Sequence, residues 1–218
     1  MTVTTQNLYR IVGFERAVQL LQSGELYFAH PSTWDDPYDQ GIAHKKSPEI
    51  FAQCWCRKAV SDAMWRIYSP NNLGVRIGTT VNRLKAELDA SKLRYKIMNI
   101  KYKTTQDLRA SLVQLEQKRK EKPSFLTTVA PLFLKRIAFD HERETRAVIY
   151  KPNDPSDNEQ RGVSIKVDAN ALIHSIWIDP RSPKEYVEAY THYLKKELKF
   201  KGVVKQSTLY AAREHDGE

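Results

Sequence analysis

The chain has 218 residues, of which 41% are hydrophobic, so it is long enough and apolar enough to bury the core of one domain. Its 35 Lys and Arg residues against 26 Asp and Glu residues give a formal net charge of +9, which favours acidic or phosphate-rich partners. The sequence has no apolar run long enough to cross a bilayer, no leader pattern and no lipidation signal, so we expect a cytoplasmic protein without a membrane anchor.

Hydrophobic periodicity predicts strands and helices that alternate along most of the chain. A strand at 8–12 is followed by a helix that Gly24 ends, and the Pro- and Asp-rich tract at 30–39 is a loop. A short helix holds Trp65 and Tyr68, and further helices are predicted around 81–88, at 104–122, within 124–135 and after Pro183. The remaining predicted strands are 25–29, 51–56, 74–79, 142–150, 163–167, 175–178 and 203–210.

No internal repeat and no linker divides the chain, so we expect a single α+β domain over residues 1–218 with a helical insertion around 104–136. The densest basic run lies at 118–122, where cations at the C-terminus of a helix are the ordinary interpretation and a phosphate contact is the alternative. Cys54 and Cys56 are two apart on a predicted strand, where a disulfide would be strained. They are therefore expected to be free thiols in a reducing compartment.

The segment Glu-Arg-Glu-Thr-Arg at 142–146 groups charges on a predicted strand. Because side chains alternate along a strand, Glu142, Glu144 and Arg146 are predicted to share one face. Repulsion between the carboxylates raises the pKa of one, while the guanidinium favours ionisation, so the set can divide acid, base and electrostatic roles. An exposed edge strand with ordinary salt bridges is the alternative interpretation.

The acidic loop admits a second chemistry. Asp35, Asp36 and Asp39, together with the two glutamates at 142 and 144, would supply the oxygen ligands of a magnesium site for phosphodiester cleavage. Asp-Pro turns that cap local backbone are the simpler interpretation. The histidines show no metal-ligand spacing with the cysteines, and no phosphate-binding glycine loop or nucleophile elbow is present, so we expect no metal cofactor.

Five short motifs in a fixed order resemble a bacterial family of uncharacterised domains. They are Leu-Tyr-Arg at 8–10, Gly-Glu-Leu-Tyr-Phe at 24–28, Trp-Asp-Asp-Pro-Tyr-Asp at 34–39, Met-Trp-Arg-Ile-Tyr at 64–68 and the Glu-x-Glu-x-Arg segment. The chain departs from the family at Asp35, where asparagine is usual, and at Arg10, where lysine is commoner.

This order of motifs also resembles the ADP-ribosyltransferase fold. The resemblance implies a mixed, mostly antiparallel split β-sheet with flanking helices, and NAD as a substrate. It implies that Tyr9 and Arg10 line the dinucleotide site, with Arg10 binding the pyrophosphate, and that Trp65 and Tyr68 offer aromatic faces to a ring of NAD. A surface arginine beside a core tyrosine, and core packing of at least one of the other two aromatic residues, are the structural alternatives.

The same resemblance assigns the catalytic roles. Glu144 binds the ribose hydroxyl and stabilises the positive charge that develops as the nicotinamide bond breaks. Glu142 orients or deprotonates the nucleophile, and Arg146 is counted among the NAD-binding residues. The Ser-Thr-Ser strand of many arginine-modifying transferases has no counterpart here, so protein arginine is not the expected acceptor.

The sequence therefore predicts an ADP-ribosyltransferase that modifies nucleic acid, with RNA favoured over DNA, as a toxin or phage-defence effector that an antitoxin protein would neutralise. The choice of acceptor rests on charge and analogy. A metal-dependent nuclease and a non-catalytic nucleic-acid-binding module are the alternatives.

Overall fold

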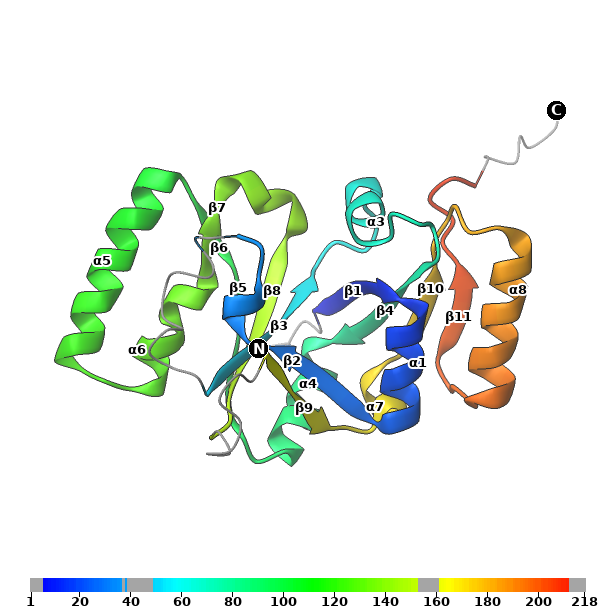
Figure 1. The fold of residues 1–218 in the computed structure, drawn as a ribbon, viewed down its shortest axis with the longest axis horizontal. Coiled ribbons are helices and arrows are strands. Elements are labelled where there is room, and N and C mark those ends of the chain that lie inside the picture. Colours follow the sequence, from blue (N-terminus) through cyan, green and yellow to red (C-terminus); the bar gives the residue numbers. More distant parts are fainter. Residues whose placement is uncertain (1–5, 37, 39–48, 153–160, 212–218) are drawn as a thin grey trace. The chain divides into compact units, whose positions relative to one another are not determined.

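Contacts within the chain divide the protein into two compact units, which are described separately (Figure 1). The computed structural model describes residues 6–36, 38, 49–152 and 161–211. That the whole chain acts as one domain stays a prediction. The first unit comprises Met1–Gly24, Lys58–Leu84 and Asp168–Glu218, and the second comprises Glu25–Arg57 and Lys85–Val167.

The first unit is built on strands from its three chain segments. In spatial order they are β11 (Val203–Gln206), β10 (Ser175–Ile178), β4 (Gly74–Thr80) and β1 (Asn7–Gly13). β4 pairs antiparallel with β1 and β10, while β10 and β11 are parallel. β4 is buried on both faces, which suits its β-branched residues, and its Val75 is fully buried.

Helices complete the first unit. α1 (Phe14–Ser23) buries Ala17 and Leu20 and ends where predicted, because Gly24 adopts a φ of 60° and donates its N–H to the Leu20 carbonyl. α4 (Val81–Ala90) follows β4, and its last residues belong to the second unit. The other helices of the first unit are α3 (Asp62–Tyr68), α7 (Ala169–Leu172), α8 (Lys184–His192) and the π-helix η5 (Tyr193–Glu197).

The second unit has an antiparallel sheet. Its strands, in spatial order, are β9 (Gly162–Lys166), β2 (Glu25–Ala29), β3 (Ile50–Cys56), β8 (Glu144–Tyr150) and β5 (Arg94–Asn99). A separate pair, β6 (Lys101–Lys103) and β7 (Leu134–Arg136), is parallel. β8 pairs with a neighbour along each edge, so it is an interior strand.

A helical segment of the second unit lies between β6 and β8 in the chain (Figure 1). Side chains of Thr104 and Ser124 cap α5 (Thr105–Glu121) and α6 (Phe125–Val129), as their sequences require. The 3-10 helices η3 (Ala130–Phe133) and η4 (Ile137–Glu142) follow, and η1 (Pro31–Thr33) succeeds β2. Buried residues of η3, including Leu132 and Phe133, pack with Ile50 and Val148 of the sheet.

The prediction of an α+β protein with a mixed, mostly antiparallel sheet and flanking helices is confirmed. The periodicity did not reveal β5, β6, β7 or α7, whose segments are short or only partly buried. Two predicted strands were too long, since β8 begins at Glu144 and β11 ends at Gln206. Among the described residues, no helix combines the length and apolar character needed to cross a membrane.

Candidate functional site

Glu142 and Glu144 belong to different elements, which corrects the prediction that they share a strand. Glu142 is the last residue of η4, and Glu144 is the first residue of β8. Arg143 between them adopts the left-handed conformation, with a φ of 46°, and its N–H bonds to the Asp140 carbonyl. This conformation separates the 3-10 helix from the strand, so strand alternation does not relate the two glutamates.

Lys135 on β7 nevertheless joins the two carboxylates. Its Nζ lies 2.6 Å from Oε2 of Glu142 and 3.2 Å from Oε2 of Glu144. The lysine side chain is 10% exposed and the glutamates are 12% and 3% exposed, so these ion pairs are largely removed from water. Burial opposes the charge on Lys135, but the two carboxylates hold its pKa above the ordinary value.

Glu144 makes a second, two-point ion pair with Arg146. Arg146 donates from Nε to Oε1 over 2.5 Å and from Nη2 to Oε2 over 3.2 Å. Its Nη1 donates to the Leu132 carbonyl, and its guanidinium lies 4.3 Å from the ring centre of Trp34. Arg146 is only 1% exposed, so its hydrogen bonds and the aromatic ring replace water around the charge.

The two glutamates have opposite pKa shifts. Burial raises the pKa of Glu144, but Arg146 and Lys135 outweigh it and lower the pKa to about 2. Burial also raises the pKa of Glu142, and the attraction of Lys135 does not reverse the effect. One carboxylate is thus held firmly ionised, while its neighbour takes up a proton more readily.

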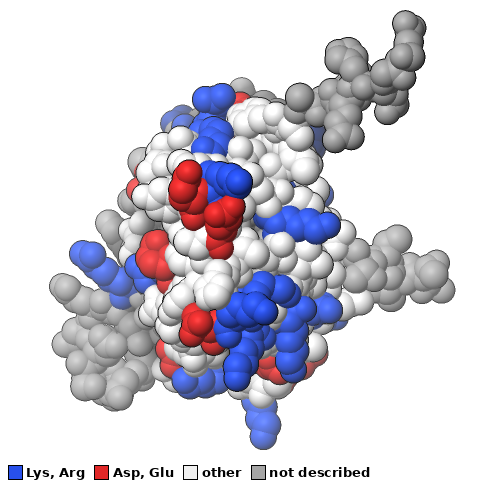
Figure 2. All heavy atoms as spheres, turned by 90° about the vertical axis from the view of Figure 1, so that its right-hand side faces the viewer, with Lys and Arg blue, Asp and Glu red and all other residues white. Residues whose placement is uncertain are grey.

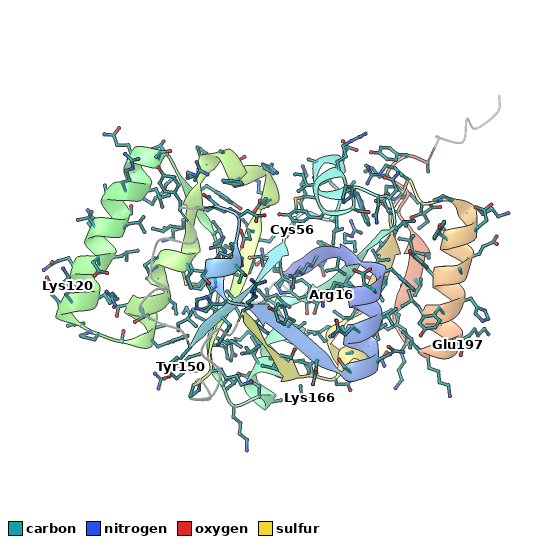
Figure 3. All side chains as sticks on the ribbon, in the orientation of Figure 1. Arg16, Cys56, Lys120, Tyr150, Lys166 and Glu197 are labelled. Carbon is teal, nitrogen blue, oxygen red and sulfur yellow. The ribbon has the colours of Figure 1, made fainter. Side chains whose placement is uncertain are left out.

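The register of β3 and β8 places the two cysteines near the buried glutamate. Cys54 lies opposite Arg146 and Cys56 opposite Glu144, so these side chains share a face of the sheet. Cys56 ends β3 and is labelled in Figure 3. Both cysteines are free thiols, and burial together with the carboxylate of Glu144 raises the pKa of Cys54. Cys54 is therefore protonated at neutral pH.

Tyr102 fixes the start of β8. Its hydroxyl accepts a hydrogen bond of 2.8 Å from the backbone N–H of Glu144, and the N–H of Ile100 donates to the Glu144 carbonyl. Burial raises the pKa of Tyr102 to about 12, so it stays a neutral phenol. On the opposite face of β8, Thr145 donates to Asn99 over 2.7 Å. Both the backbone N–H and the backbone carbonyl of Glu144 are therefore hydrogen-bonded.

The predicted NAD-binding residues Tyr9, Arg10, Trp65 and Tyr68 belong to the first unit. Tyr9 and Arg10 are neighbours on β1, so their side chains point to opposite faces of the sheet. A ligand on one face of β1 can therefore contact only one of these two side chains. The guanidinium of Arg76 lies 4.8 Å from the ring centre of Tyr9 and 5.5 Å from that of Trp177. Tyr9 therefore helps to enclose a buried arginine.

The two aromatic residues of α3 have different environments. Trp65 is 1% exposed and belongs to the core, whereas Tyr68 is 45% exposed. For Trp65 the structure thus favours the core-packing interpretation, and Tyr68 is the aromatic residue that a ligand can reach. Arg181 holds the end of this helix by donating to the carbonyls of Trp65 and Ser69, and it is itself paired with Asp179.

The acidic loop contributes an ion pair to the second unit. Asp36 accepts a hydrogen bond of 2.9 Å from Arg136, whose guanidinium also lies 4.7 Å from the ring centre of Tyr38. Asp35 is exposed, and Asp39 lies outside the described residues. Within residues 6–36, 38, 49–152 and 161–211, no group of three His, Cys, Asp or Glu side chains is arranged to hold a metal ion. The carboxylates at 36, 142 and 144 already have cationic partners.

Several residues that contact the candidates were not predicted from the sequence. Tyr102 in the second unit and Arg76 and Arg181 in the first unit have partners far away in the sequence. Lys135 contacts glutamates that are seven and nine residues away. Lys135 had one usable signal, because it directly follows the apolar stretch at 129–134.

A protein-family model described as "Protein of unknown function (DUF2971)" matches residues 64–147 of the chain. The matched range contains the segments at 64–68 and 142–146, but not those at 8–10, 24–28 and 34–39. No curated protein matches the chain significantly.

Three solved structures of DarT from Thermus sp. 2.9 are similar to the chain. The complex with NAD+ covers 96% of this chain and 100% of its own, with a TM-score of 0.47 and 12% identity. The complex with carba-NAD+ covers 94% and 96%, with a TM-score of 0.45 and 13% identity. The complex with ADP-ribosylated ssDNA covers 93% and 94%, with a TM-score of 0.46 and 11% identity.

Proposed function

We propose that this chain is an NAD-dependent ADP-ribosyltransferase that modifies nucleic acid, acting in the cytoplasm as a toxin or phage-defence effector. The observation that supports this proposal best is the pair of carboxylates on Lys135. They differ in protonation tendency, since the pKa of Glu144 is lowered to about 2 and that of Glu142 is raised. A reaction that needs one fixed anion and one proton acceptor can use such a pair.

Glu144 would carry the electrostatic role. Cleavage of the bond between nicotinamide and ribose develops positive charge on the sugar, and an ionised carboxylate stabilises that charge in the transition state. In the structure, Arg146 and Lys135 share the charge of Glu144. A ribose hydroxyl that donates to Oε2 would take the place of Lys135, whose contact with this oxygen is 3.2 Å, while Arg146 keeps the carboxylate in place.

Glu142 would act on the incoming nucleophile. Its pKa is raised by burial, so it accepts a proton more readily than an exposed glutamate does. Its side chain is 12% exposed, against 3% for Glu144. Lys135 would then hold the Glu142 carboxylate in place while the nucleophile of the nucleic acid transfers its proton to a carboxylate oxygen of Glu142.

The NAD-binding roles are proposed residue by residue. Arg10 would bind the pyrophosphate through its planar, multi-donor guanidinium, and the exposed ring of Tyr68 would stack on a ring of NAD. Tyr9 would support Arg76, Trp65 would support α3, and Arg146 would position Glu144, so these three act through other residues.

The acceptor is tested by incubating the full-length protein with NAD labelled in the adenine ring, together with separate RNA, single-stranded DNA and protein fractions. The sequence interpretation favours RNA, and a basic surface alone does not distinguish the two nucleic acid backbones. We expect label on nucleic acid in the presence of a chelator. Label found on protein alone would refute the acceptor, and cleavage of nucleic acid that a chelator abolishes would favour the nuclease.

A further inference from the structure

Exposed lysines are concentrated in the first unit between the end of η5 and the edge strand β11. Lys196 lies on η5, Lys199 and Lys201 lie in the following loop, and Lys205 lies on β11. All four are exposed, and together they are called the lysine face. Figure 2, which views the side of the molecule that carries α8 and β11, shows Lys and Arg side chains gathered in its lower half.

The loop that carries Lys199 and Lys201 is fixed by hydrogen bonds. Lys195 donates from Nζ to the carbonyls of Phe200 and Gly202 over 3.1 and 2.7 Å, and the N–H of Lys201 donates to Oδ1 of Asn170 over 2.9 Å. A Cβ atom at Gly202 would lie 2.6 Å from the His174 carbonyl oxygen, so the backbone passes close to its neighbour there. The exposed cations therefore project from a defined framework.

The local charge is strongly positive. Residues 195–205 contain five lysines and one acidic residue, Glu197. Oε1 of Glu197 lies 3.8 Å from Nε2 of His192. Within this stretch the lysines therefore outnumber the acid five to one. A surface of this kind attracts polyanions over about 8 Å at physiological ionic strength.

Protection of a sheet edge explains only part of this pattern. β11 lies at the end of the strand order of the described residues, and a lysine on an edge strand discourages unwanted strand pairing. Lys205 fits this role. Lys196, Lys199 and Lys201 precede the strand and offer no such protection.

We propose that the lysine face binds the phosphate backbone of the nucleic acid acceptor. The choice of partner rests on the proposed function, while the location rests on the lysines and their framework. We choose a nucleic acid over an anionic membrane because surfaces that insert into a membrane interface combine basic residues with exposed large apolar side chains. Within residues 195–205, all of which are described, Val203 is the one large apolar residue that is exposed.

The test compares two variants with equal changes in charge. The first is K196Q/K199N/K201Q/K205Q, and the control is K92N/K118Q/K120Q/K122Q, which removes four exposed lysines of the second unit. Asparagine replaces Lys199 and Lys92 because both have a left-handed φ, of 51° and 58°. Binding of a fluorescent, mixed-sequence single-stranded DNA and of the matching RNA is measured by anisotropy between about 50 and 200 mM salt.

We expect the lysine-face variant to bind at least about tenfold more weakly, and the slope of log affinity against log salt to fall by roughly 2 to 3, since each phosphate contact on a single strand contributes about 0.7. The control is expected to keep the affinity and slope of the wild type within about twofold. Equal losses in both variants, or no loss in either, would overturn the proposal.

Two further measurements keep the result interpretable. The variant K196R/K199R/K201R/K205R keeps the charge and is expected to restore binding, which excludes a folding defect as the cause of the loss. All binding is measured without NAD, so a failed transferase assay leaves the binding result standing. Binding to phosphatidylserine vesicles without binding to either nucleic acid would overturn the proposal in favour of a membrane.

Discussion

Arg146 donates a 2.5 Å hydrogen bond from Nε to Oε1 of Glu144, two residues before it on the same interior strand. Both side chains are almost completely buried, at 1% and 3% exposure. Removal of one partner of a buried ion pair leaves an uncompensated charge, which costs about 3–5 kcal/mol. We predict that E144Q loses stability of that order, measured by urea denaturation. A loss below about 1 kcal/mol would show that the ion pair is not intact in solution.

The pH dependence of stability follows from the lowered pKa of Glu144. Its folded pKa is about 2, against an ordinary value of 4.5, so its ionised form stabilises the fold above about pH 4.5. This contribution is lost as the pH falls from there towards about 2, and it amounts to something on the order of 3 kcal/mol. Denaturation at a series of pH values should show the decline in the wild type and a shallower decline in E144Q.

Lys135 is predicted to act by positioning the carboxylates and setting their charge. K135M removes the cation that both glutamates share, so the pKa of each glutamate rises. In a plot of the rate of NAD consumption against pH, the acidic limb should therefore move to higher pH by about 1 unit or more. K135R keeps the charge and should restore most of the profile. If the limb is the same in K135M and the wild type, Lys135 has a structural role only.

The two aromatic residues of α3 are predicted to separate stability from binding. W65A empties a buried site and should lower the free energy of unfolding by about 3–5 kcal/mol. Y68A should lower it by about 1 kcal/mol or less and raise the KM for NAD several-fold, because Tyr68 is largely exposed. Denaturation and steady-state kinetics of both variants check this. An unchanged KM in Y68A would remove Tyr68 from the NAD site.

The opposite orientations of Tyr9 and Arg10 give a paired prediction. R10K replaces a planar, multi-donor group with a point charge and should raise the KM for NAD about tenfold with little change in kcat. Y9L should instead lower stability, since the Tyr9 ring lies against the guanidinium of Arg76. An increase in KM in Y9L alone would mean that the other face of β1 binds NAD.

The sequence predicted those parts of the structure that local patterns determine. Caps and periodicity located α1, α5 and most strands, because a helix stop such as Gly24 and a cap such as Thr104 act within a few residues. The same reasoning failed at residues 142–144, where one left-handed residue, Arg143, removes the alternation on which the prediction depended. A conformation of that kind has no clear signal in a lone arginine.

The chemistry of the candidate site was predicted in part. Glu142, Glu144 and Arg146 do come together. Lys135 joins the two glutamates, and Arg146 pairs directly with Glu144. Lys135 is seven residues from Glu142 and nine from Glu144, and only the folding of β7 beside η4 and β8 brings it to them. Contacts that tertiary packing creates in this way cannot be derived from spacing along the chain.

The most direct test of the account is the release of nicotinamide from NAD by the wild type, E144Q and T145V, measured well below the lowest melting midpoint. Thr145 lies on the same strand but faces the other side of the sheet, where it bonds to Asn99, so T145V controls for a general disturbance of β8. We predict that E144Q releases nicotinamide at least about 100-fold more slowly and that T145V stays within about threefold of the wild type. Release by E144Q at the wild-type rate would contradict the account.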